Sequence, residues 1–280
     1  MKYPPILVSL LFLFAVPTLS AQPLTVMTYN IRLDVASDGE NDWTHRKDKL
    51  AAQIQFYAPN ILGIQESLPH QVSDLATRLT DYASFGIGRE ENGTSESATL
   101  FYKVAAFEVV IQHTFWLSAT PNEVSRGWDA ACNRVCTYAL FKDKKSKKQF
   151  WVFNTHLDHI GATARIKGIK LILSQINALN AKGYPVVFMG DLNSEPDSEV
   201  IATLNTAMND TRNLSVEKAF GPSGTFNAFR FDLPVTKLID YIYVSKDAKV
   251  TVQKHAILSD SIDMRYMSDH LPVFVALNFL

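Results

Sequence analysis

The chain has 280 residues and lacks several features that would assign a protein to a class directly. Two cysteines are too few for a disulfide-stapled scaffold or an all-cysteine zinc site. Lys and Arg number 27 against 28 Asp and Glu, and this net charge of −1 argues against a protein that coats nucleic acid through bulk positive charge. A Gly-x-Ser-x-Gly elbow and a phosphate-cradling glycine loop are both missing, which removes the commonest serine-hydrolase and kinase alternatives. The remaining composition is that of one large globular domain.

The longest apolar run lies at the N-terminus. Residues 1–21 combine Lys2, an apolar run over residues 6–16 and small residues up to Ala21, which is typical of a secretory signal peptide. The run is too short for a comfortable membrane span, which needs about 20 residues. An uncleaved anchor is the alternative. We expect residues 1–21 to be removed, leaving residues 22–280 as one periplasmic or secreted domain with no stable membrane span.

Two local features have both a functional and a structural interpretation. An oxidising compartment would permit a disulfide between Cys132 and Cys136, but two small buried residues beside a strand explain the pair equally well. Five lysines within residues 142–148 could form a nucleic-acid patch, although a solvated turn between two strands explains them better.

Short apolar runs alternate with helical patterns along the chain. Leu50, Ile54 and Tyr57 recur at helical spacing before Pro59, which predicts a helix that ends there. Further helices are predicted within 71–79 and 166–176. Strands are predicted at 24–29, 61–64, 98–102, 108–117, 137–141, 150–154, 185–189, 238–244, 250–255 and 273–277. This mixture indicates an α/β protein with two packed sheets and helices outside.

Polar side chains repeatedly follow these apolar strands. A single aspartate after a strand is usually a turn residue or a helix cap. Several such residues together suggest that strand ends converge on one rim, where sites are commonly built. Their carboxylate and amide oxygens suit Mg²⁺ or Mn²⁺, and a histidine paired with an aspartate can hold an imidazolium against phosphate. The pattern therefore points to metal-assisted hydrolysis of a phosphoester.

Six ordered motifs resemble those of the endonuclease/exonuclease/phosphatase superfamily. They are Met27-Thr-Tyr-Asn30, Ile64-Gln-Glu66, Asn154-Thr-His156-Leu-Asp158, Gly190-Asp191-Leu-Asn193, Ile239-Asp240-Tyr241 and Ser268-Asp269-His270. The resemblance implies a four-layer α/β sandwich with two central mixed β-sheets flanked by helices, and a divalent-metal site at one edge. The stretches Trp43-Thr-His-Arg46 and Gly224-Thr-Phe-Asn227 look closer to the deadenylase-like and uncharacterised secreted members.

The resemblance also implies a role for each matching position. Glu66, Asn30 and Asp269 correspond to residues at or near the metal. Asp191 corresponds to the aspartate that orients or deprotonates the attacking water, and Asn193 to its partner. His156 and His270 correspond to phosphate-contacting residues, and Asp240 to the carboxylate that orients the second of these histidines.

Arg32 departs from the family pattern. Repair nucleases have an acidic residue two positions after the first-strand asparagine, where this chain has Arg32, so one carboxylate fewer is available for metal. Arg32 could bind a substrate phosphate or form a salt bridge with Glu66. Three more residues are candidate substrate contacts, each with a structural alternative: Trp128, Arg134 and Arg165.

The function predicted from these features is hydrolysis of a phosphodiester or phosphomonoester of a small soluble substrate by an exported, monomeric, Mg²⁺- or Mn²⁺-dependent enzyme. A nuclease needs a basic surface that the charge balance does not suggest. A lipid phosphodiesterase needs an exposed apolar hairpin, and the candidate for one, residues 115–117, fits a buried strand better. A non-catalytic binding protein on the same fold is the alternative from another class.

Overall fold

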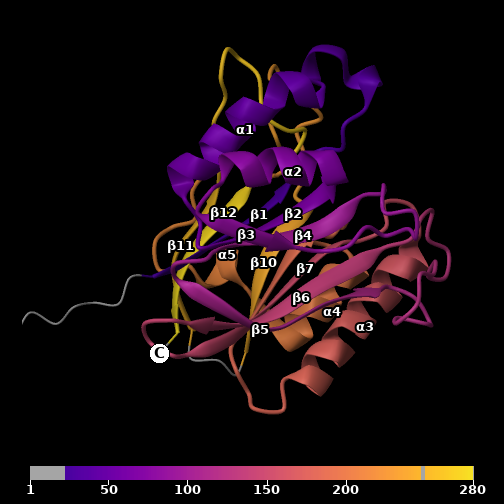
Figure 1. Cartoon of the computed structure of the whole chain (residues 1–280), viewed down its shortest axis with the longest axis vertical. Helices are drawn as coiled ribbons and strands as arrows, with labels where there is room; N and C mark the ends of the chain where they lie inside the picture. The colour runs from indigo at the N-terminus through magenta and orange to yellow at the C-terminus, as the bar shows by residue number, and fades with distance from the viewer. Residues whose placement is uncertain (1–22, 247–249, 280) are drawn as a thin grey trace, which may run out of the picture.

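Two six-stranded sheets packed face to face form the centre of the computed structural model, which describes residues 23–246 and 250–279 (Figure 1). The expected signal peptide, residues 1–21, lies outside the described residues. The first sheet has the order β11-β12-β1-β2-β4-β3. Its strands are β1 (Leu24–Asn30), β2 (Ile61–Ser67), β3 (Tyr82–Phe85), β4 (Ser97–Lys103), β11 (Val250–Ile257) and β12 (Val273–Phe279).

The second sheet has the order β5-β6-β7-β8-β10-β9. Its strands are β5 (Phe107–Trp116), β6 (Val135–Asp143), β7 (Gln149–His156), β8 (Val186–Asp191), β9 (Met208–Asp210) and β10 (Asp240–Ser245). In each sheet one central pair is parallel, β1 with β2 and β7 with β8, while the other pairs are antiparallel. The prediction of two mixed sheets is confirmed.

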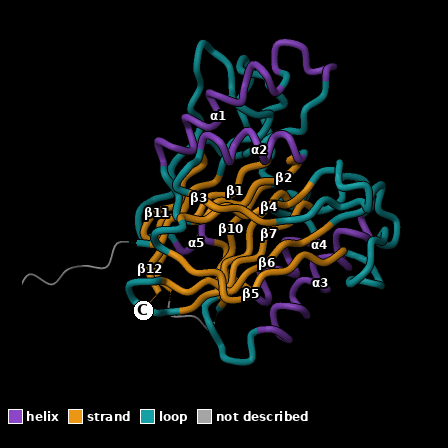
Figure 2. The backbone as a smooth tube through the Cα atoms, in the orientation of Figure 1, coloured by secondary structure: helices purple, strands orange, loops and turns teal. Residues whose placement is uncertain are grey.

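Helices cover the outer faces of both sheets and complete the predicted four-layer sandwich (Figure 2). They are α1 (Trp43–Tyr57) and α2 (Pro69–Arg78) against the first sheet, and α3 (Ala162–Leu179) and α4 (Glu199–Ala207) against the second, with a short α5 (Thr211–Leu214) and a 3-10 helix, η1 (Ala36–Asn41). Among the described residues, no helix is both long enough and apolar enough to span a membrane.

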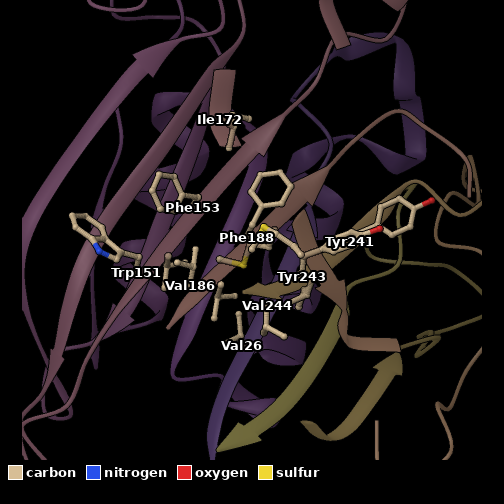
Figure 3. Packing of buried hydrophobic residues seen from close by; sticks show 14 of the residues in the cluster. Val26, Trp151, Phe153, Ile172, Val186, Phe188, Tyr241, Tyr243 and Val244 are labelled. Atoms are coloured by element: carbon tan, nitrogen blue, oxygen red, sulfur yellow. The ribbon is translucent and has the colours of Figure 1, made fainter. Parts of the chain in front are cut away.

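Alternation along the strands determines which side chains enter which layer. In β1, Val26 packs between the sheets, whereas its neighbour Met27 packs under α1 with Leu50 and Ile54. The inter-sheet cluster joins Val26 to Phe188 of β8 and continues to Ile172 of α3 (Figure 3). The sandwich is therefore filled with apolar side chains both between the sheets and under the helices.

Most predicted elements appear with extended ends, and a few features were not predicted. The chain forms β3 and α4 where no element was expected, and β10 begins at Asp240 rather than at residue 238. The lysines of residues 142–148 lie at the turn between β6 and β7, as the structural interpretation predicts. Cys132 and Cys136 are free thiols, the latter buried in β6, so the disulfide alternative was wrong.

Gly190, next to Asp191 in β8, is a position where only glycine fits. Its φ is +145°, and a Cβ there would lie 1.9 Å from the carbonyl oxygen of Thr155 on β7. We expect Gly190→Ala to lower the free energy of unfolding by about 2 kcal/mol or more, because backbone must move apart in the core. Urea unfolding measures this. Gly183→Ala, also at positive φ but with no atom within 4 Å of the place its Cβ would take, is the matched control, and an equal loss there would contradict the steric explanation.

Candidate active site

One amide side chain joins carboxylates from the two sheets at the carboxyl ends of their parallel strands. Asn30 ends β1, and its Nδ2 donates to Glu66 Oε1 at 2.9 Å and to Asp191 Oδ2 at 3.0 Å. Glu66 lies near the end of β2 in the first sheet, and Asp191 ends β8 in the second. The rim predicted from polar residues at strand ends is therefore formed by both sheets.

The backbone at this rim is held in unusual conformations. Glu66 has a φ of 60° within a β-bulge of β2, and Asn193 has a φ of 43° just after β8. Residues other than glycine rarely adopt a positive φ. Where they do, the surrounding contacts hold the backbone in place, and such residues cluster at functional sites. Here the backbone N–H of Leu33 donates to Glu66 Oε2 at 3.1 Å, which fixes the carboxylate that the bulge has turned toward the rim.

A buried histidine lies between two carboxylates. Nδ1 of His270 is 2.8 Å from Asp240 Oδ2, and its Nε2 is 3.8 Å from Asp191 Oδ2. Burial alone would lower the pKa of His270, but Asp240 and Asp191 outweigh it and raise that pKa to about 10. His270 is therefore an imidazolium at neutral pH. Burial and the nearby Asp240 carboxylate in turn raise the pKa of Asp191.

A second histidine, His156, is held in the opposite state. Its Nε2 is 3.0 Å from Asn193 Nδ2 and 3.4 Å from Asp191 Oδ2. Burial and the nearby Arg134 hold the pKa of His156 well below its usual range, so the ring is neutral. A neutral Nε2 can accept from the Asn193 amide, whose own backbone N–H donates to Asp191 Oδ1 at 2.9 Å. The two histidines thus place one charged donor and one neutral ring within 4 Å of Asp191 Oδ2.

Two residues to which the sequence analysis gave no role hold this arrangement in place. Thr225 Oγ1 accepts from the backbone N–H of Asp240 at 3.2 Å, which fixes the partner of His270. Ser268 Oγ donates to the carbonyl oxygen of Asn30 at 2.7 Å and ties the His270 loop to β1. Both lie inside stretches that the sequence analysis quoted, and for Ser268 its position next to Asp269 was a signal that could have identified it.

Comparison with known proteins decides the family. The model of the Endonuclease/Exonuclease/phosphatase family matches residues 27–270. The chain belongs to this family. Members of the endonuclease/exonuclease/phosphatase family are hydrolases that act on phosphoesters, and the acidic and histidine side chains above cluster as such a site requires. The family resemblance predicted from the six motifs is confirmed.

Several members of the family are similar to the chain over most of its length. A mannosyl-6-phosphatase of Bacteroides thetaiotaomicron has a TM-score of 0.87 and 32% identity, covering 91% of this chain and 100% of the other. The catalytic domain of human nocturnin with bound sulfate has a TM-score of 0.73 and 25% identity, covering 92% of this chain and 94% of the other. Mouse nocturnin is 24% identical over 294 residues, covering 93% of this chain but only 66% of the mouse protein.

The donor set at the rim fits the divalent ion that family members typically use. Glu66, His156 and Asp191 each place a ligand atom within 4.8 Å of the others, and so do Asp191, Asp240 and His270. Among the described residues, the buried Oδ1 of Asp240 has no hydrogen-bond partner. Carboxylate and amide oxygens are the donors that Mg²⁺ and Mn²⁺ prefer. The family resemblance predicts that Glu66 and Asn30 would hold the ion, with Asp269 near it, and this assignment stays a prediction.

The four candidate substrate contacts lie around this cluster rather than in it. Arg32 pairs with Asp38, with Nε to Oδ2 at 2.9 Å, so the suggested salt bridge with Glu66 was wrong. Arg134 is buried, with its Nε 3.4 Å from Asp158 Oδ2 and its Nη2 2.9 Å from His159 Nδ1.

The other two candidates are nearer the surface. Arg165 donates to the carbonyl oxygen of Asp158 at 2.9 Å, and Trp128 is 37% exposed with Lys167 Nζ 5.6 Å from its ring. Substrate contact by any of the four stays a prediction.

Removing the partner of His270 is expected to change the pH profile. His270 is charged below its pKa of about 10, and Asp240 does most to raise that pKa. In Asp240→Asn the pKa falls, so the imidazolium and the activity it supports are lost at a lower pH. We expect the alkaline fall in kcat/KM to move down by at least about one pH unit. Initial rates between pH 6 and 10 with Mg²⁺ measure it, and an unchanged profile would contradict the pairing.

Proposed function

We propose that the chain hydrolyses a phosphomonoester of a small, soluble, sugar-sized substrate with the help of Mg²⁺ or Mn²⁺. The observation that carries the proposal is the buried imidazolium of His270, which Asp240 holds with its Nε2 3.8 Å from the Asp191 carboxylate that Asn30 joins to Glu66. A fixed positive donor beside a carboxylate base suits a reaction in which negative charge develops on phosphoryl oxygens.

Each residue of the cluster has a chemical task in this reaction. A divalent ion held at Glu66 and Asn30 would neutralise charge on a phosphoryl oxygen. Asp191, whose pKa is raised by burial, orients the attacking water and takes its proton, and the Asn193 backbone N–H fixes the carboxylate for that task. The Nε2–H of His270 donates to a phosphoryl oxygen, while Nδ1–H remains bonded to Asp240. As the water oxygen bonds to phosphorus, the ester P–O bond breaks, and the leaving oxygen takes a proton from solvent and departs as the free alcohol.

Three observations favour a small substrate. The chain is 32% identical to a protein named as a mannosyl-6-phosphatase, and that name describes a phosphorylated sugar as the substrate of that protein. The run of Phe115, Trp116 and Leu117 is buried, so it forms no apolar hairpin that could enter a membrane. The lysine-rich turn precedes Gln149 at the start of β7, whereas His156 is at its end, about 23 Å away at 3.3 Å per residue. The turn is therefore poorly placed to hold a polyanion at the rim.

Export is part of the same proposal. Residues 1–21 have the charge and apolar pattern of a signal peptide, and removal would free a domain that begins near β1 at Leu24. N-terminal sequencing of the protein recovered from the periplasm or medium tests it. A mature protein that retains residues 1–21 would contradict cleavage.

A panel of phosphoesters tests the proposed reaction. Purified protein is assayed on hexose 6-phosphates, bis(p-nitrophenyl) phosphate, single-stranded DNA and RNA, and sphingomyelin vesicles, after chelation and again with Mg²⁺ or Mn²⁺ restored. We expect phosphate release from a hexose phosphate that chelation abolishes and either ion restores. Faster cleavage of the oligonucleotides or the vesicles would favour the nuclease or lipid alternative, and inactivity throughout would favour a non-catalytic binding protein.

A further inference from the structure

A guanidinium lies at the edge of the site where the carboxylates gather. Nη1 of Arg32 is 3.9 Å from Asp269 Oδ2, while its Nε and Nη2 are bonded to the two carboxylate oxygens of Asp38 at 2.9 and 3.0 Å. The hydrogen bonds to Asp38 raise the pKa of Arg32, and the charges of Asp269 and Glu66 add to the effect. A guanidinium is protonated at any physiological pH, so Arg32 is a permanent cation beside the Asp269 carboxylate.

The position of Arg32 is fixed through its backbone. Its φ is 59°, and its N–H donates to Asn30 Oδ1 at 3.0 Å. Its carbonyl oxygen accepts from Gln71 Nε2 at 2.9 Å and Arg46 Nη2 at 3.2 Å, and both of those side chains are buried. A non-glycine residue stays at positive φ only where its surroundings over-determine it. The guanidinium is consequently a built part of the rim and not a free surface side chain.

A fixed positive charge in this place competes with a second metal ion. Two-metal sites hold their ions about 3.5–4 Å apart, so a second ion needs a further acidic ligand close beside the first ion. Glu66 and Asn30 are joined to Asp191 through the Asn30 amide, whereas Asp269 is the rim carboxylate 3.9 Å from Nη1 of Arg32. A second divalent ion on Asp269 would therefore stand beside the guanidinium, where like charges repel strongly.

We propose that Arg32 replaces a second metal ion: it closes Asp269 to a divalent cation, limits the site to one ion, and donates from Nη1 to a phosphoryl oxygen of the substrate. Nη1 makes no hydrogen bond within residues 23–246 and 250–279, so it is available to a ligand. The inference rests on the proposed metal dependence and adds to it the number of ions and a residue that recognises phosphate.

Calorimetric titration with MnCl₂ alone counts the ions. An ion is counted as bound at this site when the wild type binds it and the Glu66→Gln variant does not. We expect one in the wild type and two in Arg32→Asp, which removes the guanidinium and adds a carboxylate of a residue type that tolerates positive φ. Arg265→Gln is the matched control, because it removes one exposed arginine that pairs with Glu40 of η1, and it should keep one ion.

A second variant and a second ligand guard against a misfolded mutant. Arg32→Asn, also tolerated at positive φ, should bind the single ion at least ~10-fold more tightly and inorganic phosphate, titrated with Mn²⁺ present, at least ~10-fold more weakly. Circular dichroism and thermal unfolding check that each variant is folded.

The outcomes separate this inference from the proposed function. Two site ions in the wild type, or a folded Arg32→Asp that still binds one, would overturn the role of Arg32 while leaving metal dependence intact. Unchanged ion and phosphate affinities in a folded Arg32→Asn would overturn it as well. A wild type that binds no Mn²⁺ would refute the metal dependence itself, and the inference with it.

Discussion

Asp191→Asn is expected to lower kcat by at least ~100-fold, because the variant cannot take a proton from the attacking water. The substitution keeps the shape of the side chain, and an amide oxygen can still accept from the backbone N–H of Asn193. The loss should therefore appear in kcat far more than in KM. Steady-state kinetics on whichever phosphoester the panel identifies measures both constants.

A matched control separates this effect from a general loss of a strand-end carboxylate. Asp210 ends β9 in the same sheet, is partly buried, and accepts from the backbone N–H of Arg212 at 2.8 Å. It has no contact with the cluster, so Asp210→Asn should keep kcat within about twofold. Near-normal rates in a folded Asp191→Asn would remove Asp191 from the role of base.

His270→Gln should cost at least ~100-fold in kcat/KM, because the reaction loses a fixed positive donor in a buried site. Glutamine can still donate a hydrogen bond, so the variant tests the charge rather than the bond alone. The expected loss depends on the raised pKa of His270, to about 10, which keeps the ring protonated at neutral pH. Single-turnover rates at pH 7 measure the chemical step directly.

His255 provides the control for His270. It is equally buried in β11, but it binds Thr211 Oγ1 at 3.1 Å and burial lowers its pKa to about 4, so it is neutral. His255→Gln is expected to lower stability with little change in kcat/KM. A comparable loss of activity in both variants would mean that His270 acts only by supporting the fold.

The strand ends were the predictable part of this molecule. Asn30 and Asp191 end strands whose preceding residues are mostly apolar. An apolar run of this kind predicts a buried strand, and the polar residue that ends it is then expected at the edge of the sheet. The structure brings Asn30, Glu66 and Asp191 into contact as that argument requires. Their tasks in catalysis are carried by the family resemblance and still need the experiments above.

The parts that could not be predicted depend on contacts far apart in sequence or on loop shape. Arg32 pairs with Asp38 because the short helix η1 turns Asp38 toward it. The sequence of η1 has no apolar pattern from which that turn could be predicted. Helix α4 was missed because it has only nine residues, too few for a clear helical period. The Gln65 amide donates to Asn154 Oδ1 at 2.7 Å across the two sheets, and no local pattern specifies such a partner.

The bridge that Asn30 makes between Glu66 and Asp191 links hydrolysis to the docking of the two sheets. Neither sheet alone contains both carboxylates, so the cluster around an ion at Glu66 and Asn30 is complete only in the closed sandwich, and the ion binds the folded chain rather than the unfolded one. At a concentration 100 times its Kd such an ion adds about 2.7 kcal/mol to the free energy of unfolding. Chelation should therefore lower the melting temperature of the whole sandwich, and activity should return during refolding only when the sheets have closed on each other.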